Sequence, residues 1–229
     1  MNDDRFHRLR LLLGAENVAK LNASTVAVFG VGGVGSFAVE ALARSGVGHL
    51  ILIDKDNVDV TNINRQLHAL TSTVGKSKVE VMRERIHDIN PAAQVDAIQK
   101  FLLPGEPVED FFICRYDYVV DAIDTLTAKI FLVEECTRRG VKIISSMGAG
   151  NKLDATRFKV GDIFQTTTDP VAKIMRKRLK DKKITRLKVV WSDEPPLPVK
   201  DFIGSVAFVP SVVGLIMAGE VVKDLIAAQ

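Results

Sequence analysis

Apolar residues gather along the chain in short continuous runs, and each run is followed by a polar or glycine-rich stretch. Such runs are typical of strands that are buried on both faces of a parallel sheet. The clearest runs are Val26–Phe29, His49–Ile53, Gln94–Gln99, Tyr116–Ala122 and Val141–Ser146. Helical patterns lie between most of them, so the sequence predicts a doubly wound α/β fold with a mainly parallel, Rossmann-like sheet.

The helical patterns cover Phe37–Arg44, Lys78–Asn90, a short stretch at 106–113 and Thr125–Arg139. Beyond residue 150, two further strands, Arg157–Val160 and Leu187–Trp191, flank a basic helical segment at 170–184. We therefore expect an N-terminal helical arm (1–24), a nucleotide-binding domain (25–150) and a smaller C-terminal lobe (151–229) in one continuous structural unit.

Residues 202–218 contain no charged side chain, which raises the possibility of a membrane span. Pro210 and scattered glycines and serines interrupt the stretch, and its length is at the lower end of what a span requires. We expect a strand to about Phe208 and then a buried helix to Ile226, without stable membrane insertion.

A glycine-rich turn follows the first strand. Gly30, Gly32 and Gly35 fit the pattern GxGxxG, with Gly33 as an additional glycine, and a helix follows. Glycine suits this position because a Cβ atom would block both the tight backbone path and the approach of a phosphate to the N–H groups at the helix start. Asp54 ends the second strand, where a carboxylate can accept hydrogen bonds from ribose hydroxyls. The pattern predicts a nucleotide site but does not choose between NAD, FAD and ATP.

Two further regions carry candidate ligands for this site. The polar loop from residue 56 to 66 contains Asn62, Asn64, Arg65 and Gln66 and is expected at the carboxyl end of the sheet. Asp121 and Asp124 follow the fourth strand, where carboxylates could hold Mg²⁺ together with phosphate oxygens, although Asp124 could instead serve only as a helix N-cap.

Composition narrows the class of protein. Hydrophobic residues make up 47% of the 229 residues, enough for a large core without disulfides or metals. The two cysteines, Cys114 and Cys136, are too far apart for a CxxC zinc motif, so no structural zinc is expected. The N-terminus lacks the apolar segment of a signal peptide, and we expect a cytoplasmic protein.

Positive charge is concentrated in one segment. Between Lys173 and Lys188, nine basic residues stand against the single acid Asp181, although the net charge of the chain is only +3. These basic residues could form a charged helix face that is simply exposed to water, or they could bind a polyanion such as RNA. The residues that we expect to bind RNA are Arg176, Lys177, Arg178, Lys182 and Lys183.

The chain resembles the ubiquitin-activating-enzyme-like superfamily of adenylating enzymes in the order of its motifs. These are the glycine-rich turn, Asp54, the stretch NINRQ at 62–66, Lys78 and the stretch DAID at 121–124. Several stretches, FGVGGVGS, EALARSGVG, DVTNINRQLHAL, INP and SSMGAGNKLDATRF, are similar to those of its tRNA threonylcarbamoyladenosine dehydratases. The resemblance extends over nearly the whole chain, from Arg5 to about Ile226. The resemblance implies that residues 25–150 form an ATP-binding domain.

The resemblance also implies roles for individual residues. Arg65 and Lys78 would neutralise the phosphates, Asp124 would bind Mg²⁺, and Asp54 would hold the ribose. Asn62, Asn64 and Gln66 would be polar contacts to nucleotide or acceptor. An arginine of the N-terminal arm would reach across a homodimer, and Arg8 matches that position best, with Arg5 as the alternative.

The activity that the resemblance implies is ATP-dependent dehydration of threonylcarbamoyladenosine at position 37 of a tRNA. The carboxylate of the modification would first be adenylated, and a ring would then close with loss of AMP. A cysteine desulfurase and sulfur-acceptor system would be a further partner by family context. Segment 192–203 is shorter than the corresponding loop of relatives, which leaves the acceptor-facing side chains open.

Two other functions compete with this hypothesis. One is an adenylyltransferase for the C-terminal carboxylate of a ubiquitin-like sulfur-carrier protein, whose members usually hold zinc with two CxxC pairs. The other is a Rossmann domain that binds NAD. A test of RNA binding separates the dehydratase from the adenylyltransferase. A comparison of ATP and NAD binding separates it from the NAD-binding domain.

Overall fold

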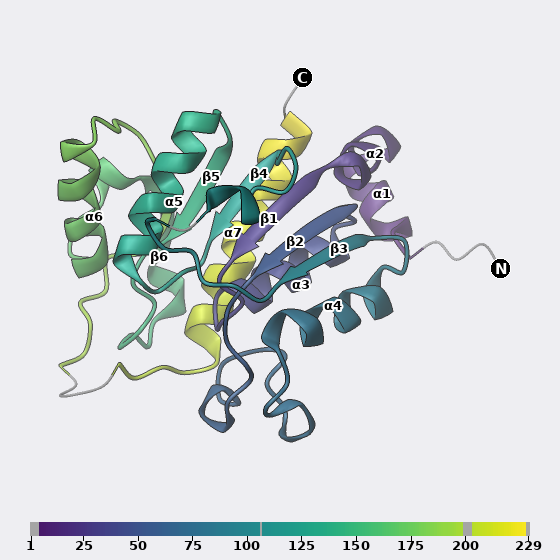
Figure 1. Ribbon diagram of the computed structural model, residues 1–229, viewed down its shortest axis with the longest axis horizontal. Helices are drawn as coiled ribbons and strands as arrows, with labels where there is room; N and C mark the ends of the chain where they lie inside the picture. The colour runs from purple at the N-terminus through teal and green to yellow at the C-terminus, as the bar shows by residue number, and fades with distance from the viewer. Residues whose placement is uncertain (1–4, 106, 199–202, 228–229) are drawn as a thin grey trace.

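The computed structural model describes residues 5–105, 107–198 and 203–227 (Figure 1). Its helices are α1 (His7–Leu13), α2 (Ala15–Ala23), α3 (Gly35–Arg44), α4 (Lys78–Ile89), α5 (Leu126–Arg139), α6 (Pro170–Asp181) and α7 (Phe208–Ala227). Its strands are β1 (Thr25–Phe29), β2 (His49–Ile53), β3 (Gln94–Ile98), β4 (Tyr118–Asp121), β5 (Lys142–Ser146), β6 (Phe158–Asp162) and β7 (Lys188–Ser192).

All of these strands belong to one sheet with the order β3-β2-β1-β4-β5-β7-β6. Every neighbouring pair is parallel except β7 and β6, which are antiparallel. The predicted mainly parallel, doubly wound sheet is therefore confirmed. The described part of residues 151–229 adds the strands β6 and β7 to the sheet beyond β5. In the sheet, β7 lies between β5 and β6.

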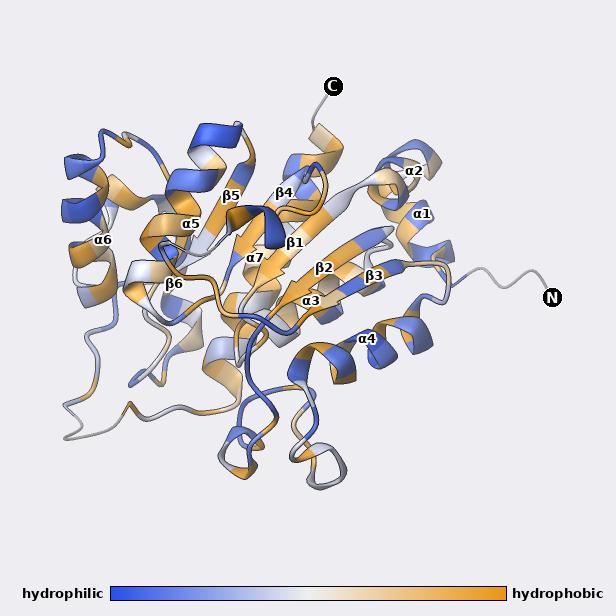
Figure 2. Ribbon diagram, in the orientation of Figure 1, coloured by the Kyte–Doolittle hydropathy of each residue, from blue (hydrophilic) through white to orange (hydrophobic). Residues whose placement is uncertain are grey.

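Helices cover both faces of the sheet (Figure 1). Alternate residues of β1 point to opposite sides, so that Val26 and Val28 join a core with α3, α4 and α7 while Ala27 and Phe29 join a core that includes α5. A third core lies between α5 and α6. Figure 2 shows the central strands as mostly hydrophobic, which explains why they read as continuous apolar runs in the sequence.

The long helix α7 packs closely along α3, the helix that follows the glycine-rich turn. Gly214 makes this approach possible, because a Cβ atom at this position would lie 2.2 Å from the Val34 carbonyl oxygen. Among the described helices, none combines the length and the hydropathy that a membrane span needs. The apolar C-terminal stretch is thus used to cover one face of the sheet.

Two predicted elements were wrong. No strand occurs at 203–207, the described part of the strand expected before Phe208, and the chain instead passes over the carboxyl end of the sheet. There the Asn151 N–H donates to the Gly204 carbonyl, and the Gly204 N–H donates to the side-chain oxygen of Asn151. The Asn64 side chain donates to the Ser205 carbonyl. The helix expected at 106–113 is reduced, within its described part, to the short 3-10 turn Val108–Asp110.

Candidate active site

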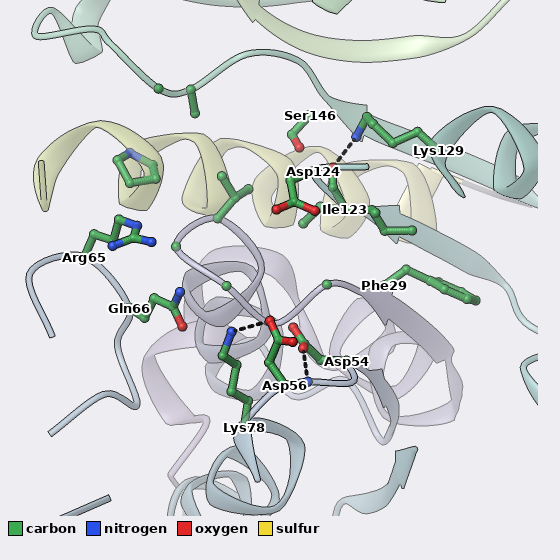
Figure 3. Close-up of a pocket in the computed structure, with 18 of the residues that line it drawn as sticks. Phe29, Asp54, Asp56, Arg65, Gln66, Lys78, Ile123, Asp124, Lys129 and Ser146 are labelled. Atoms are coloured by element: carbon green, nitrogen blue, oxygen red, sulfur yellow. Dashed lines mark hydrogen bonds and ion pairs between the residues drawn. The ribbon is translucent and has the colours of Figure 1, made fainter. Parts of the chain in front are cut away.

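A cleft opens at the carboxyl ends of β1 and β4, where the strand order changes direction (Figure 3). Ligands of open α/β sheets bind at this kind of switch point. The cleft has a volume of about 480 Å³, which lies within the range of small-molecule sites. Its walls come from the glycine-rich turn, the loops after β2, β4 and β5, the start of α4 and the segment before α7.

The four glycines of the turn divide into two pairs. Gly30 has a φ of 85°, and a Cβ atom there would lie 2.6 Å from the Ala122 carbonyl oxygen. A Cβ atom on Gly35 would lie 1.8 Å from the Gly30 carbonyl oxygen. Gly32 and Gly33 line the cleft, and a Cβ atom on Gly32 would meet nothing closer than 3.8 Å. Gly30 and Gly35 therefore have to be glycine for the turn itself to form, whereas Gly32 and Gly33, together with Gly30, face the ligand space.

Asp54 connects the glycine-rich turn to the loop after β2. Its carboxylate accepts hydrogen bonds from the backbone N–H groups of Val31, at 2.7 Å, and of Asp56, at 2.9 Å. The side chain is half-buried and lines the cleft. Because each carboxylate oxygen has two lone pairs, Asp54 keeps acceptor capacity for a hydroxyl group.

Lys78 reaches the cleft from the first residue of α4. Its side chain is buried, and its ammonium lies 3.1 Å from the carboxylate of Asp56 (Figure 3). Asp56 was missed in the sequence analysis, although its position two residues after Asp54 at the end of a buried strand was a usable signal. Asp56 is exposed and also lines the cleft, so this pair can separate when an anion binds.

The polar loop brings three of its four predicted residues to the cleft. Arg65 projects into the cleft, while its guanidinium also donates to the Thr61 carbonyl at 2.8 Å (Figure 3). The Asn62 carboxamide oxygen accepts from the Asp59 N–H and thereby caps the turn. Gln66 is buried, and its Oε1 atom has no hydrogen-bond partner within the described residues. Asn64 holds Ser205 instead of lining the cleft.

The two aspartates after β4 have different environments. Asp124 is exposed and lines the cleft, and Thr125, not Asp124, is the N-cap of α5. Asp121 does not face the cleft: it is fully buried, and its carboxylate contacts Lys129 at 3.0 Å and Ser145 at 2.5 Å. The proposed pair of metal ligands therefore reduces to Asp124, and within the described residues no group of three or more acidic, histidine or cysteine side chains is placed to hold a metal.

Arg8 is exposed on α1 and does not belong to the cleft of its own chain. The helical arm leads into the amino end of β1, whereas the cleft lies at the carboxyl end. Arg5 donates to the Ile89 carbonyl at the end of α4, also on the amino side. A role for Arg8 at a nucleotide site thus requires a second copy of the chain.

The basic segment forms α6 and the loop after it, and its cations are not equivalent. Lys177, Arg178 and Lys183 are exposed. Arg176 is half-buried and donates to the Thr166 carbonyl at 2.9 Å, and Lys182 pairs with Glu134 at 2.6 Å. The side chains available to a polyanion are therefore fewer than the sequence predicted, because tertiary contacts occupy part of the set.

The two cysteines lie outside the cleft. Cys136 is buried in α5, and burial raises the pKa of its thiol. Cys114 is exposed beyond the 3-10 turn, and partial burial together with Asp96 and Asp117 raises the pKa of its thiol as well. Neither thiol is activated as a nucleophile.

A glycine-rich turn, two cations and a carboxylate around one cleft of a doubly wound sheet define a nucleotide-binding protein. The sequence profile of the ThiF family matches residues 6–228, and the chain belongs to this family.

The chain is 50% identical to the tRNA threonylcarbamoyladenosine dehydratase of Bacillus subtilis, over 97% of this chain and 94% of that protein. The crystal structures of the Escherichia coli tRNA N6-threonylcarbamoyladenosine dehydratase TcdA in complex with ATP and with AMP are similar in fold. Both match with a TM-score of 0.92 over 97% of this chain and 94% of that chain, at 36% and 37% identity.

Proposed function

We propose that this chain is an ATP-dependent tRNA threonylcarbamoyladenosine dehydratase. The observation that carries the proposal is the cleft with Gly32, Arg65, Lys78 and Asp124, in a chain that is 50% identical to a dehydratase over nearly its full length. The ATP and AMP complexes of a protein with the same fold support ATP as the nucleotide. NAD is disfavoured, because it has no pyrophosphate leaving group for the two cations and a metal ion on Asp124 to neutralise.

ATP would bind with its phosphates beside Gly32 and Gly33, whose lack of side chains exposes the backbone N–H groups. Asp54 would accept hydrogen bonds from the ribose. Lys78 would exchange its contact with Asp56 for a contact with a phosphate oxygen, and Arg65 would neutralise further negative charge on the phosphates. The Gln66 side chain, buried with an unpartnered oxygen, would donate and accept at the nucleotide or the acceptor.

Mg²⁺ is part of this proposal. Mg²⁺ is typically bound by one or two carboxylates together with substrate phosphates and water, and the exposed carboxylate of Asp124 in the cleft fits that role without a larger acidic cluster. When bound, the ion would neutralise charge on the phosphates and favour departure of pyrophosphate.

The chemistry would proceed in two steps. In the first, a carboxylate oxygen of the threonylcarbamoyl group attacks the α-phosphorus of ATP, and pyrophosphate leaves. In the second, a nucleophile within the same modification attacks the acyl carbon and AMP leaves, so that the net change is loss of water. Lys78 and Arg65 would stabilise the charge that builds up on the phosphates. The steps need no enzyme thiol, which agrees with the raised pKa of Cys136.

The tRNA would lie along α6. This helix begins at Pro170, next to Val171 in the wall of the cleft, and carries Lys177 and Arg178 on its exposed side farther from the cleft. A polyanion bound there could place one nucleotide in the cleft. Lys182 and Arg176 would have to exchange their present partners to take part.

A homodimer in the cytoplasm, with Arg8 acting in the partner's site, completes the proposal. A cysteine desulfurase and sulfur-acceptor system remains a further proposed partner by family context. Pull-down of the purified chain with such proteins would test this partnership independently of catalysis.

Mass analysis of tRNA nucleosides tests the central proposal. Substrate tRNA that carries threonylcarbamoyladenosine is incubated with enzyme, ATP and Mg²⁺, and the modified nucleoside should lose the mass of one water. The Lys78→Ala variant serves as the inactive control. Unchanged nucleosides, combined with ATP-dependent adenylation of a sulfur-carrier protein, would instead establish the competing adenylyltransferase.

A further inference from the structure

Lys129 and Asp121 form an ion pair that is buried at the base of the cleft. Lys129 is 1% exposed and Asp121 is fully buried, and the ammonium lies 3.0 Å from the carboxylate. Ser145 also donates to this carboxylate, at 2.5 Å. Lys129 is part of the cleft wall (Figure 3), so the pair lies directly behind the ligand space.

The ion pair holds both backbone polar groups of one residue, Ile123. The Asp121 carboxylate accepts from the Ile123 N–H at 3.1 Å, and the Lys129 ammonium donates to the Ile123 carbonyl at 3.0 Å. Ile123 directly precedes Asp124. The peptide group between Ile123 and Asp124 is therefore held by Lys129 through its carbonyl oxygen. The preceding peptide group, between residues 122 and 123, is held by Asp121 through its N–H.

Stability alone is a poor explanation for such a pair. Removing two charges from water costs several kcal/mol per ion, and well-packed apolar residues often replace a buried ion pair without loss of stability. By contrast, hydrogen bonds in which one partner is charged are about twice as strong as neutral ones, which suits them to fixing the orientation of a backbone segment. Asp124, at the end of this segment, is an exposed side chain with no helix-capping role.

We propose that Lys129 and Asp121 are positioning residues that hold Asp124 in the orientation that binds the metal ion of metal–ATP. The inference rests on the proposed role of Asp124 as the magnesium ligand. Lys129 acts through Ile123, because its ammonium donates to the Ile123 carbonyl. The two aspartates at the carboxyl end of β4 then have separate roles: Asp121 orients the backbone, and Asp124 binds the ion.

The test compares variants by the affinity of the enzyme–ATP complex for Mn²⁺, measured by electron paramagnetic resonance. The double variant Lys129→Met/Asp121→Asn removes both charges together, so that no unpaired charge remains buried, and it retains an acceptor for the Ile123 N–H. We expect its affinity for Mn²⁺ to fall by about tenfold, close to the loss in Asp124→Asn. Its affinity for ATP without metal should change by less than about threefold, a difference below about 0.7 kcal/mol.

A matched control separates orientation from general destabilisation. Met175→Ala creates a cavity in the core between α5 and α6 at a residue that does not itself line the cleft, and it should lower the thermal midpoint without weakening Mn²⁺ binding. An equal loss of Mn²⁺ affinity in Met175→Ala would overturn the inference. So would normal Mn²⁺ binding in the double variant while Asp124→Asn binds weakly. Normal Mn²⁺ binding in Asp124→Asn would overturn both this inference and the proposed metal role of Asp124.

Discussion

The Lys78 ammonium lies 3.1 Å from the Asp56 carboxylate, and the two side chains differ sharply in burial, with 6% of Lys78 and 50% of Asp56 exposed. The pair thus holds a buried cation in place through a partner that water can solvate. If the phosphates of a nucleotide enter as proposed, the half-exposed Asp56 would turn to solvent, whereas the buried Lys78 would stay directed at the cleft.

Replacing Lys78 should affect catalysis more than folding. We expect Lys78→Ala to lower the rate of pyrophosphate release by at least about a hundredfold, because the transition state loses charge stabilisation worth a few kcal/mol. Circular dichroism should remain that of the unaltered protein, since Asp56 is left in contact with water. Near-normal pyrophosphate release from this variant would contradict the site assignment.

Two glycines of the same turn should respond differently to alanine. Gly35→Ala should prevent correct folding, because its Cβ atom would lie 1.8 Å from a backbone oxygen. Gly32→Ala should fold normally but weaken ATP binding by about tenfold or more, because the new methyl group occupies the space of a phosphate. Thermal unfolding and ATP titration measure the two effects separately. Unchanged ATP affinity in Gly32→Ala would place the phosphates elsewhere.

The exposed cations of α6 should control the salt dependence of tRNA binding. Replacing Lys177 and Arg178 by glutamine should flatten the slope of log affinity against log salt by about 1.4 to 1.8 units, since each neutralised phosphate contributes about 0.7 to 0.9. ATP affinity should stay constant. The matched control replaces Lys20 and Arg44, which lie on helices of the opposite face, and should leave the slope unchanged. An unaltered slope in the α6 variant would show that tRNA binds elsewhere and that the cations of α6 only contact water.

A trans role of Arg8 can be tested by mixing two inactive variants. In a dimer of Arg8→Ala with Lys78→Ala, one site has both Lys78 and the partner's Arg8. Random exchange of subunits should therefore restore about a quarter of the normal activity. Sedimentation at micromolar concentration should show a dimer. A monomer, or mixed variants that stay inactive, would argue against this role.

His68 should make stability depend on pH. Burial, with a smaller contribution from Lys78, lowers the pKa of this histidine to about 4, while the unfolded chain keeps the ordinary value of 6.5. Between these values the unfolded state binds more protons, so stability rises with pH. The contribution should be fully present above pH 6.5 and disappear as the pH falls to 4. Denaturant titrations of the unaltered protein and of His68→Phe should show a flatter pH dependence in the variant; parallel curves would contradict the assignment.

Much of this molecule follows from short stretches of its sequence. The runs Val26–Phe29 and Leu50–Ile53 are apolar on both faces, and such runs are typical of strands buried inside a parallel sheet. The glycine-rich turn and Asp54 are adjacent to these strands. The fold class and most of the cleft could therefore be predicted, because both depend on local pattern and on the rule that the carboxyl ends of parallel strands share one edge.

Only the tertiary structure decided which polar side chains are available. Asp121 and Asp124 look alike in the sequence, yet Lys129 and Ser145 enclose the first and leave the second in the cleft. Arg176 and Lys177 are neighbours in a basic run, yet Thr166 holds only the first. Local pattern determines where a strand or turn forms, whereas the partner of a charge comes from segments far along the chain and is set only when these segments pack together.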